Sequence, residues 1–240
     1  MKAGTVALLV LLMIFSSAIA QKGKKWTDWN KKEAQKILDD SPWAKTQTDT
    51  DTSEMMFTPT STPGSSSTNA ERSVFGATNQ AVNIKFHVHF YSARPVRQAL
   101  ARIMELDNPK LDPAAIARLH SFGEMKSAES VIVTVTYESP DQRYTGIVLQ
   151  AFSSAVTAVL KNDTFLQRSS DGKQLFLEEY VPPGKDGFGA RFIFLRNVNG
   201  APFIDDKSGE IHFATKYPNG IKVDRRFKVA DMMYEGALEY

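Results

Sequence analysis

The sequence predicts an α+β fold, with helices concentrated in the first half of the chain and strands in the second half. Two helical runs of apolar residues lie at residues 94–103 and 112–123, and an alternating apolar–polar run at 83–91 indicates a strand with one buried face. After residue 162, four Gly-containing turn dipeptides separate short runs rich in β-branched and aromatic residues. We therefore expect a short N-terminal helix, a Ser/Thr-rich linker, and then helices packed on an antiparallel sheet that ends in a β-meander.

Composition excludes several classes of function. The 240 residues include 29 Lys and Arg against 27 Asp and Glu, so a general binder of nucleic acid is not expected. The chain contains no Cys, which excludes disulfide bonds, thiolate nucleophiles and Cys-ligated zinc. The length is sufficient for one hydrophobic core, and no second core is required. Nothing in the sequence indicates a cofactor.

Residues 1–20 are typical of a secretory signal peptide. Lys2 supplies the positive charge, residues 6–15 form the apolar run, and Ala18-Ile19-Ala20 fits the small-residue cleavage rule, with Gln21 as the first residue after it. The apolar run is too short to span a bilayer as a helix. We expect cleavage, no membrane span afterwards, and export to the periplasm or the cell exterior. A cysteine-free exported chain of this size favours a bacterial source.

A short helix is expected directly after this signal, within a Trp-rich segment at residues 21–45. Asn30 and Glu33 have the spacing of a capping box, so the helix should begin at Asn30. Pro42 should end it, because the residue before a proline is disfavoured in helical conformation. Trp26, Trp29 and Trp43 flank this helix, and large aromatic side chains are frequent anchors in protein interfaces. These three Trp residues are the candidate partner-binding residues.

Residues 46–80 are predicted to form a flexible linker rich in Ser, Thr and Pro. Of the 28 residues from 46 to 73, 14 are Ser or Thr, so little of this stretch can be buried. The Trp-rich segment can then be either tethered to the body by the linker or packed on it, and three Trp within 18 residues favour packing.

The main α+β domain is predicted to span residues 81–240. Asp112 and Pro113 have the character of a helix N-cap and a first helical residue, and residues 130–137 indicate a strand. A largely buried helix is expected through Leu149, Phe152, Val156 and Val159. Strands should then follow at residues 164–168, 173–180, 190–196, 210–216 and 221–229, with turns at Asp171-Gly172, Asn199-Gly200, Ser208-Gly209 and Asn219-Gly220.

Several stretches of the chain resemble a set of uncharacterised exported bacterial proteins. The similarity lies in Trp26-Thr27 followed by the run Ile-Leu-Asp-Asp-Ser-Pro-Trp-Ala at residues 37–44, in Phe-Tyr-Ser-Ala-Arg-Pro at residues 90–95, and in the ending Arg-Phe-Lys-Val at 226–229 with Leu-Glu-Tyr at 238–240. The resemblance implies an exported bacterial protein. It implies no particular activity, cofactor or catalytic residue for this chain.

His87 and His89 are the candidate metal ligands. They lie two residues apart on a predicted strand, so both imidazoles should project from one face, where they can bind one ion. A metal site needs a third donor, and the remaining histidines are His120 and His212. The competing interpretation is two polar side chains on the solvent face of an amphipathic strand.

Other patterns give weaker indications of chemistry. No Gly-x-Ser-x-Gly elbow is present, and Glu178 and Glu179 should point to opposite faces of a strand. The Gly- and Pro-rich loop at residues 182–189 leads into a strand instead of a helix, so we interpret it as a rigid connection or a contact surface. The catalytic residues, if there are any, are unknown from the sequence.

Two functions remain open. The leading hypothesis is a non-enzymatic binding or structural module of the bacterial cell envelope, whose partner would be another envelope protein. The alternative is a periplasmic hydrolase with an unpatterned or metal-dependent site that uses His87 or His89.

Overall fold

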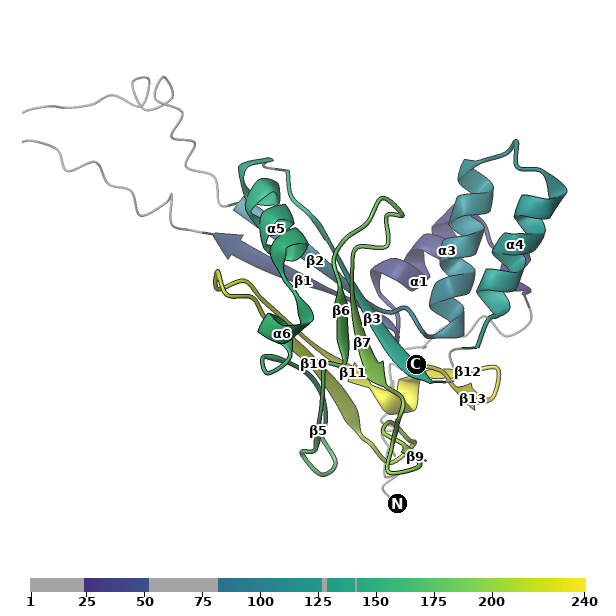
Figure 1. The fold of residues 1–240 in the computed structure, drawn as a ribbon. Helices are drawn as coiled ribbons and strands as arrows, with labels where there is room; N and C mark the ends of the chain where they lie inside the picture. Colours follow the sequence, from purple (N-terminus) through teal and green to yellow (C-terminus); the bar gives the residue numbers. More distant parts are fainter. Residues whose placement is uncertain (1–23, 52–81, 127–128, 141) are drawn as a thin grey trace, which may run out of the picture.

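The computed structural model describes residues 24–51, 82–126, 129–140 and 142–240, and it confirms the α+β class. Two antiparallel sheets lie against each other, with one group of helices on the outer side of the larger sheet and a second group at one end (Figure 1). The predicted signal peptide at residues 1–20 lies outside the described residues, and so do residues 52–80 of the predicted linker. Among the described residues, no helix combines the length and apolar character needed to cross a membrane.

The N-terminal segment is part of the fold. It contains η1 (Trp26–Asp28), α1 (Lys31–Asp39) and β1 (Ala44–Asp51). The capping box of α1 is present as predicted, since the Asn30 side chain accepts from the Glu33 amide and the Glu33 side chain accepts from the Asn30 amide. Strand β1, however, runs into the range for which the sequence predicts a linker. Its Asp residues are unfavourable in a strand although its Thr residues are favourable, and pairing with β2 supplies hydrogen-bond partners for its backbone.

The larger sheet, sheet A, has the strand order β1-β2-β3-β7-β6, and the smaller one, sheet B, has the order β11-β10-β4-β5. All the neighbouring pairs are antiparallel. Sheet A contains β1, β2 (Val82–Phe90), β3 (Ser130–Glu138), β6 (Glu179–Val181) and β7 (Ala190–Leu195). Sheet B contains β4 (Thr164–Arg168), β5 (Gln174–Phe176), β10 (Glu210–Lys216) and β11 (Lys222–Lys228). The strand predicted at residues 173–180 is therefore divided between the two sheets.

Short elements complete the second half of the chain. They are β8 (Asn197–Val198), β9 (Ala201–Pro202), the single turn η3 (Val229–Asp231), β12 (Met233–Tyr234) and β13 (Ala237–Leu238). Each of the pairs β8–β9 and β12–β13 forms its own two-stranded ladder.

The hydrophobic core fills the space between the two sheets. Phe90 of β2 meets Phe227 of β11 edge-on at 4.8 Å between ring centroids, and Phe192 of β7 meets Phe213 of β10 at 5.2 Å. These four side chains have at most 1% of their surface exposed. Because side chains alternate along a strand, burying Phe86, Val88 and Phe90 on this inner face places Lys85, His87 and His89 on the outer face of sheet A.

Helices α5 (Gln142–Ser154) and α6 (Thr157–Leu160) lie at one end of the two sheets. Phe152 stacks on Tyr217 at 4.7 Å and on Phe86 at 6.2 Å. The predicted buried face of this region is right for Phe152 and wrong for the other three residues, since the exposed fractions of Leu149, Val156 and Val159 are 50%, 54% and 48%. The chain leaves the helix after Ser154 and starts a new turn at Thr157, which shifts the buried face to Val148, Phe152, Ala155 and Leu160.

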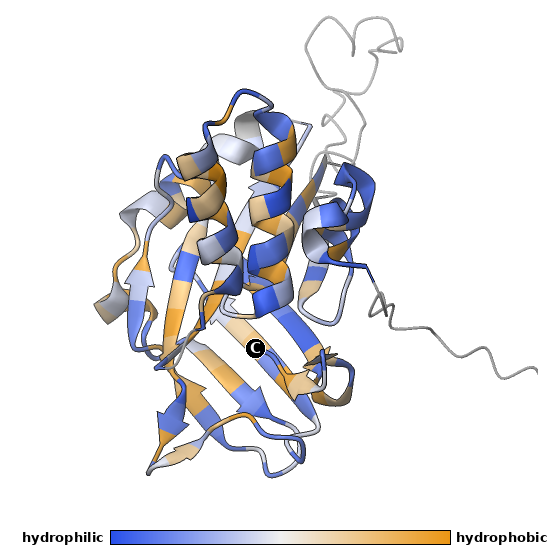
Figure 2. Cartoon of the chain, turned by 90° about the vertical axis from the view of Figure 1, so that its right-hand side faces the viewer, coloured by the Kyte–Doolittle hydropathy of each residue, from blue (hydrophilic) through white to orange (hydrophobic). Residues whose placement is uncertain are grey.

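Helices α3 (Arg94–Asp107) and α4 (Pro113–Glu124) form a hairpin on the outer side of sheet A, together with α1 (Figure 2). Asp112 caps α4 as predicted, because its carboxylate accepts from the Ala115 amide at 2.6 Å. Arg97 on α3 is buried and donates to the backbone carbonyls of Ser92 and Met125, which ties the ends of this hairpin to sheet A.

Trp26 fixes the N-terminal segment to this helical hairpin. Its indole Nε1 donates to Glu124 Oε1 at 2.6 Å, and its ring lies edge-on to His120 at 5.0 Å. Gly123 makes room for it, since a Cβ atom at that position would lie 3.1 Å from the indole ring. Gly123 lies within the last turn of α4 and serves the packing of Trp26.

The other two Trp side chains are also buried within the chain. Trp29 is 3% exposed, and its carbonyl oxygen accepts from Arg102 Nε at 2.7 Å. Trp43 is 4% exposed, donates to the Glu239 carbonyl oxygen at 2.8 Å, and lies edge-on to Tyr234. Of the two arrangements that the sequence left open, the structure has the segment packed on its own domain.

We predict that Gly123→Leu lowers the free energy of unfolding by about 2–4 kcal/mol, because the added side chain must displace Trp26. Gly146→Leu is the matched control, since Gly146 is an exposed helical glycine and a Cβ atom added there would have no neighbour within 4 Å. The control should change stability by less than about 1 kcal/mol. Urea unfolding followed by circular dichroism measures both values, and equal losses in the two variants would contradict the docking of Trp26.

Candidate functional site

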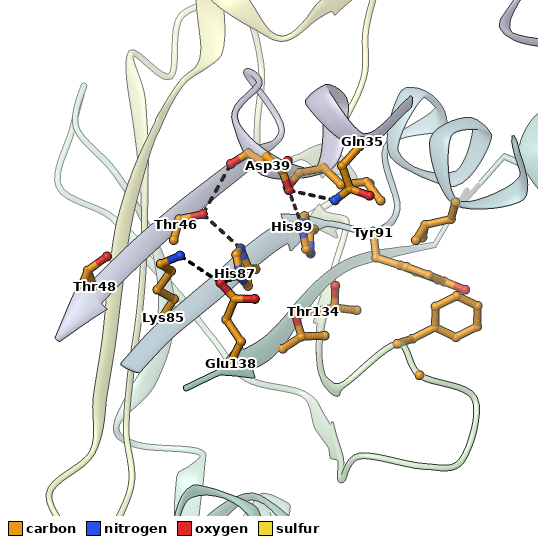
Figure 3. Close-up of a pocket in the computed structure, with 15 residues that line it drawn as sticks. Gln35, Asp39, Thr46, Thr48, Lys85, His87, His89, Tyr91, Thr134 and Glu138 are labelled. Carbon is orange, nitrogen blue, oxygen red and sulfur yellow. Dashed lines mark hydrogen bonds and ion pairs between the residues drawn. The ribbon is translucent and has the colours of Figure 1, made fainter. Parts of the chain in front are cut away.

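A groove lies on the outer face of sheet A, where the helices leave β1, β2 and β3 partly uncovered (Figure 3). Its volume is about 610 Å³. The three strands form the floor, α1 and Leu100 of α3 form one wall, and Tyr91 and Phe188 lie at one end. The groove therefore has a size that fits a small molecule or a short segment of a polymer.

The register of the three strands arranges the floor in rows. Thr46, His87 and Thr136 are cross-strand partners in one row, and Thr48, Lys85 and Glu138 form the next. Neighbouring side chains in such rows lie close enough to interact. The floor is thus polar, while the opposite faces of β2 and β3 belong to the hydrophobic core.

His87 lies at the centre of the floor. Its Nδ1 is 3.0 Å from Thr46 Oγ1, and its Nε2 is 3.6 Å from Glu138 Oε1. Lys85 Nζ donates to the same Glu138 oxygen at 3.0 Å. This hydrogen bond from Lys85 lowers the pKa of the Glu138 carboxyl group. The middle of the groove therefore holds a hydroxyl, an imidazole and an ion pair in contact with one another.

His89 lies deeper, under α1. Its Nε2 is 2.8 Å from the Leu38 carbonyl oxygen, and because a carbonyl oxygen can only accept, Nε2 carries the proton. Burial lowers the pKa of His89 to about 4, so the ring is neutral at pH 7. His87 and His89 have nearly parallel rings, with centroids 6.5 Å apart. His89 thus stabilises the end of α1 and holds this wall of the groove against β2.

Aromatic side chains define the opposite end of the groove. Tyr91 and Phe188 have ring centroids 5.2 Å apart, and Phe122 of α4 lies within 6.2 Å of each. The chain can bring Phe188 there because Gly187 and Gly189 both have positive φ, at 78° and 76°. At Gly189 a Cβ atom would overlap the Val135 carbonyl oxygen, so only glycine fits. The loop at residues 182–189, predicted to be a rigid connection or a contact surface, contributes Gly187 and Phe188 to the groove.

The two candidate metal ligands share a face, as the sequence predicts. The other histidines lie elsewhere, His120 beside Trp26 on α4 and His212 on β10 beside Asp224. Within the described part of the chain, no group of three or more His, Cys, Asp or Glu side chains is placed to hold a metal ion. The metal site stays a prediction, and His89 Nε2 already donates a hydrogen bond to the Leu38 carbonyl oxygen.

The three Trp candidates lie in the core, and several residues of the groove were not candidates from the sequence. Trp26, Trp29 and Trp43, the candidate partner-binding residues, lie in the core of this chain. Sequence reasoning misses the groove residues Thr46, Thr48, Thr134 and Thr136, although their two-residue spacing could have indicated a polar sheet face. Tyr91 lies in the predicted strand and Phe188 in the predicted contact loop, but nothing in the sequence indicates that these two side chains and Glu138 come together, because only the fold brings them together.

Comparison with protein-family models finds no match, and comparison with curated proteins and with solved structures finds no significant match either. The resemblance to exported bacterial proteins therefore stays an expectation from the sequence.

The pKa of His89 predicts a loss of stability in mild acid. The unfolded chain takes up the proton near pH 6.5 and the folded chain near pH 4, so the folded state binds fewer protons between these values. Stability is fully present above pH 6.5 and falls as the pH drops toward 4, by at most about 3 kcal/mol from this group. Urea unfolding of the wild type and of His89→Gln at pH 7 and pH 4.5 isolates this contribution.

The His89→Gln variant should have a flatter pH dependence than the wild type, because an amide does not titrate. His120→Gln serves as the control and should keep the wild-type slope. An unchanged slope in His89→Gln would show that His89 is not held in its neutral form by burial.

Proposed function

We propose that this protein is a non-enzymatic binding module of the bacterial cell envelope and that its ligand occupies the groove on sheet A. The observation that supports this proposal is a groove of about 610 Å³ whose polar side chains are held in place by the fold. Side chains fixed in this way lose little conformational freedom when a ligand binds, which favours affinity.

The state of four ionisable groups in the groove, Lys85, Glu138, His89 and Tyr91, favours binding over catalysis. Lys85 and Glu138 neutralise each other, and His89 is neutral with its Nε2 proton donated to the Leu38 carbonyl group. Burial raises the pKa of the Tyr91 hydroxyl, which keeps it protonated. A general acid or base needs a pKa near the working pH, and His89 and Tyr91 are shifted away from it.

The envelope location rests on the sequence. The signal-like residues 1–20 support export, the absence of Cys favours a bacterial source, and the near-balanced charge argues against nucleic acid as the partner. The proposed partner is a component of the envelope, either another protein, as the sequence suggested, or a ligand bound in the groove.

A periplasmic hydrolase is the second candidate, and one contact favours it. The Thr46 hydroxyl, the His87 imidazole and the Glu138 carboxylate follow one another across the sheet, in the order of a nucleophile, a base and an acidic group. The Thr46 hydroxyl also lies 3.4 Å from the Asp39 carbonyl oxygen, which competes for its proton. A hydrolase of this kind predicts that His87→Ala abolishes turnover of an ester substrate.

The binding proposal predicts that the protein, purified from its own host, carries a bound molecule. Thr48→Trp should remove it, because Thr48 is an exposed residue at the groove where a large side chain fills space without disturbing the core. Gln174→Trp is the matched control, on the exposed edge strand β5 of the other sheet. Native mass spectrometry of the three proteins measures the mass of the bound molecule.

The expected result is an added mass on the wild type and on Gln174→Trp, reduced by at least about tenfold in occupancy on Thr48→Trp. No added mass on the wild type, or equal retention in both variants, would contradict the proposal. A bound metal ion that is lost in His87→Ala would favour the hydrolase instead.

A further inference from the structure

We infer that the ligand of the groove is a neutral oligosaccharide. The inference rests on the proposed function, since it names the chemical class of the molecule that the groove binds. Three features of the groove carry it: two inner floor strands that offer only side-chain groups, a preponderance of groups that both donate and accept hydrogen bonds, and an aromatic end.

The two inner strands of the floor offer a ligand side-chain groups only. In sheet A, β2 and β3 are paired on both edges, so their backbone amide and carbonyl groups point sideways to neighbouring strands and not into the groove. An extended peptide gains much of its affinity from backbone pairing with a free strand edge. In this floor the edge strand is β1, and its Thr46 carbonyl oxygen already accepts from Arg225 Nε at 3.1 Å, which makes a peptide a poorer occupant than a ligand that uses its own substituents.

The side-chain groups that line the groove match hydroxyls. Thr46, Thr48 and Thr136, together with the buried Thr134, line the groove on the two strands that flank β2, and a Thr hydroxyl can both donate and accept. The Gln35 amide and the His87 imidazole add further groups of the same kind at the wall and the floor. A sugar ring carries several hydroxyls with the same dual character, spaced around a rigid ring, so it can satisfy a floor of this composition.

The aromatic end provides a surface for the apolar face of a sugar. Tyr91 and Phe188 both line the groove and are half-buried, with their rings 5.2 Å apart. The axial C–H groups of a pyranose form an apolar face that packs on an aromatic ring, while its hydroxyls point to the side. Phe188 is held in position by the two glycines beside it and by Asp186, whose carboxylate accepts from the Phe188 amide at 3.1 Å.

The charge of the groove favours a neutral sugar. Lys85 is paired with Glu138, which leaves Asp39 as the remaining carboxylate among the described lining residues. Asp39 accepts a hydrogen bond from the Gln35 side chain at 2.8 Å. Among these described lining residues, no unpaired cation is present to attract a sulfated or uronic-acid sugar, and a carboxylate there repels one.

Titration of the full chain with soluble tetrasaccharides tests the inference. The neutral probes are the β-1,4-linked tetramers of N-acetylglucosamine and of glucose and the α-1,4-linked tetramer of glucose, and the charged probe is a heparin tetrasaccharide. Saturation-transfer NMR identifies the sugar protons in contact with the protein, and calorimetry gives the dissociation constant. We expect at least one neutral probe to bind, with the strongest transfer to its axial ring protons.

Two variants locate the binding. Phe188→Ala should weaken it about tenfold by removing the stacking surface, and Thr136→Val should weaken it about threefold to tenfold by removing a hydroxyl without changing the shape. Phe176→Ala is the matched control, because Phe176 is 46% exposed and lies on β5 of the other sheet. It should leave the dissociation constant unchanged.

Each other outcome overturns the inference. Binding of no neutral probe, binding of the heparin tetrasaccharide alone, or equal losses in Phe188→Ala and Phe176→Ala would each do so. The mass of the co-purifying molecule distinguishes a failure of the oligosaccharide inference from a failure of the proposed binding function. A bound molecule that is not a sugar but is lost in Thr48→Trp leaves the binding module standing, whereas no bound molecule together with no binding of any probe removes both.

Discussion

The pairing of β1 with β2 is the contact on which the rest of the outer face depends. Its register runs from Ala44 opposite His89 to Asp51 opposite Val82, and it brings a segment from before residue 52 onto the edge of a sheet built from residues after 81. Helix α1 immediately precedes β1, so the same pairing fixes α1 over β2, where His89 contacts the Leu38 carbonyl group. Without this pairing the groove would lose a strand of its floor and a wall.

Strands β2 and β3 separate the hydrophobic core from the polar groove. Toward sheet B, β2 and β3 bury Phe86, Val88, Phe90 and the valines of β3, and this core makes the position of each backbone rigid. On the other side, the alternate residues are polar and only partly covered by helices. A one-residue shift in register would exchange the two faces, so the core that stabilises the domain also holds the threonine and histidine rows of the groove in place.

The sequence predicts well the features that depend on neighbouring residues, and it predicts poorly the features that depend on contacts between distant segments. The capping box at Asn30, the Asp112 cap, the strand at residues 83–91 and the shared face of His87 and His89 depend on neighbouring residues, and the structure has each of them. Strand β1 falls largely within the predicted linker, because its polar residues show no alternation of apolar and polar side chains. Glu138 reaches the groove because β3 pairs with β2, and Phe188 reaches it because a turn places glycine on each side of it. No spacing in the sequence encodes either arrangement.

The most direct test of the β1–β2 pairing is hydrogen exchange along the N-terminal segment of the full chain. If β1 is an integral strand of sheet A, its amides that face β2 should exchange about as slowly as those of β3, since both open only when the sheet opens. Mass spectrometry of peptides covering residues 44–51 and 130–138 measures both in one experiment. Exchange of residues 44–51 at the rate of an unstructured chain would contradict the pairing, because the groove would then lack a strand of its floor and the wall that α1 provides.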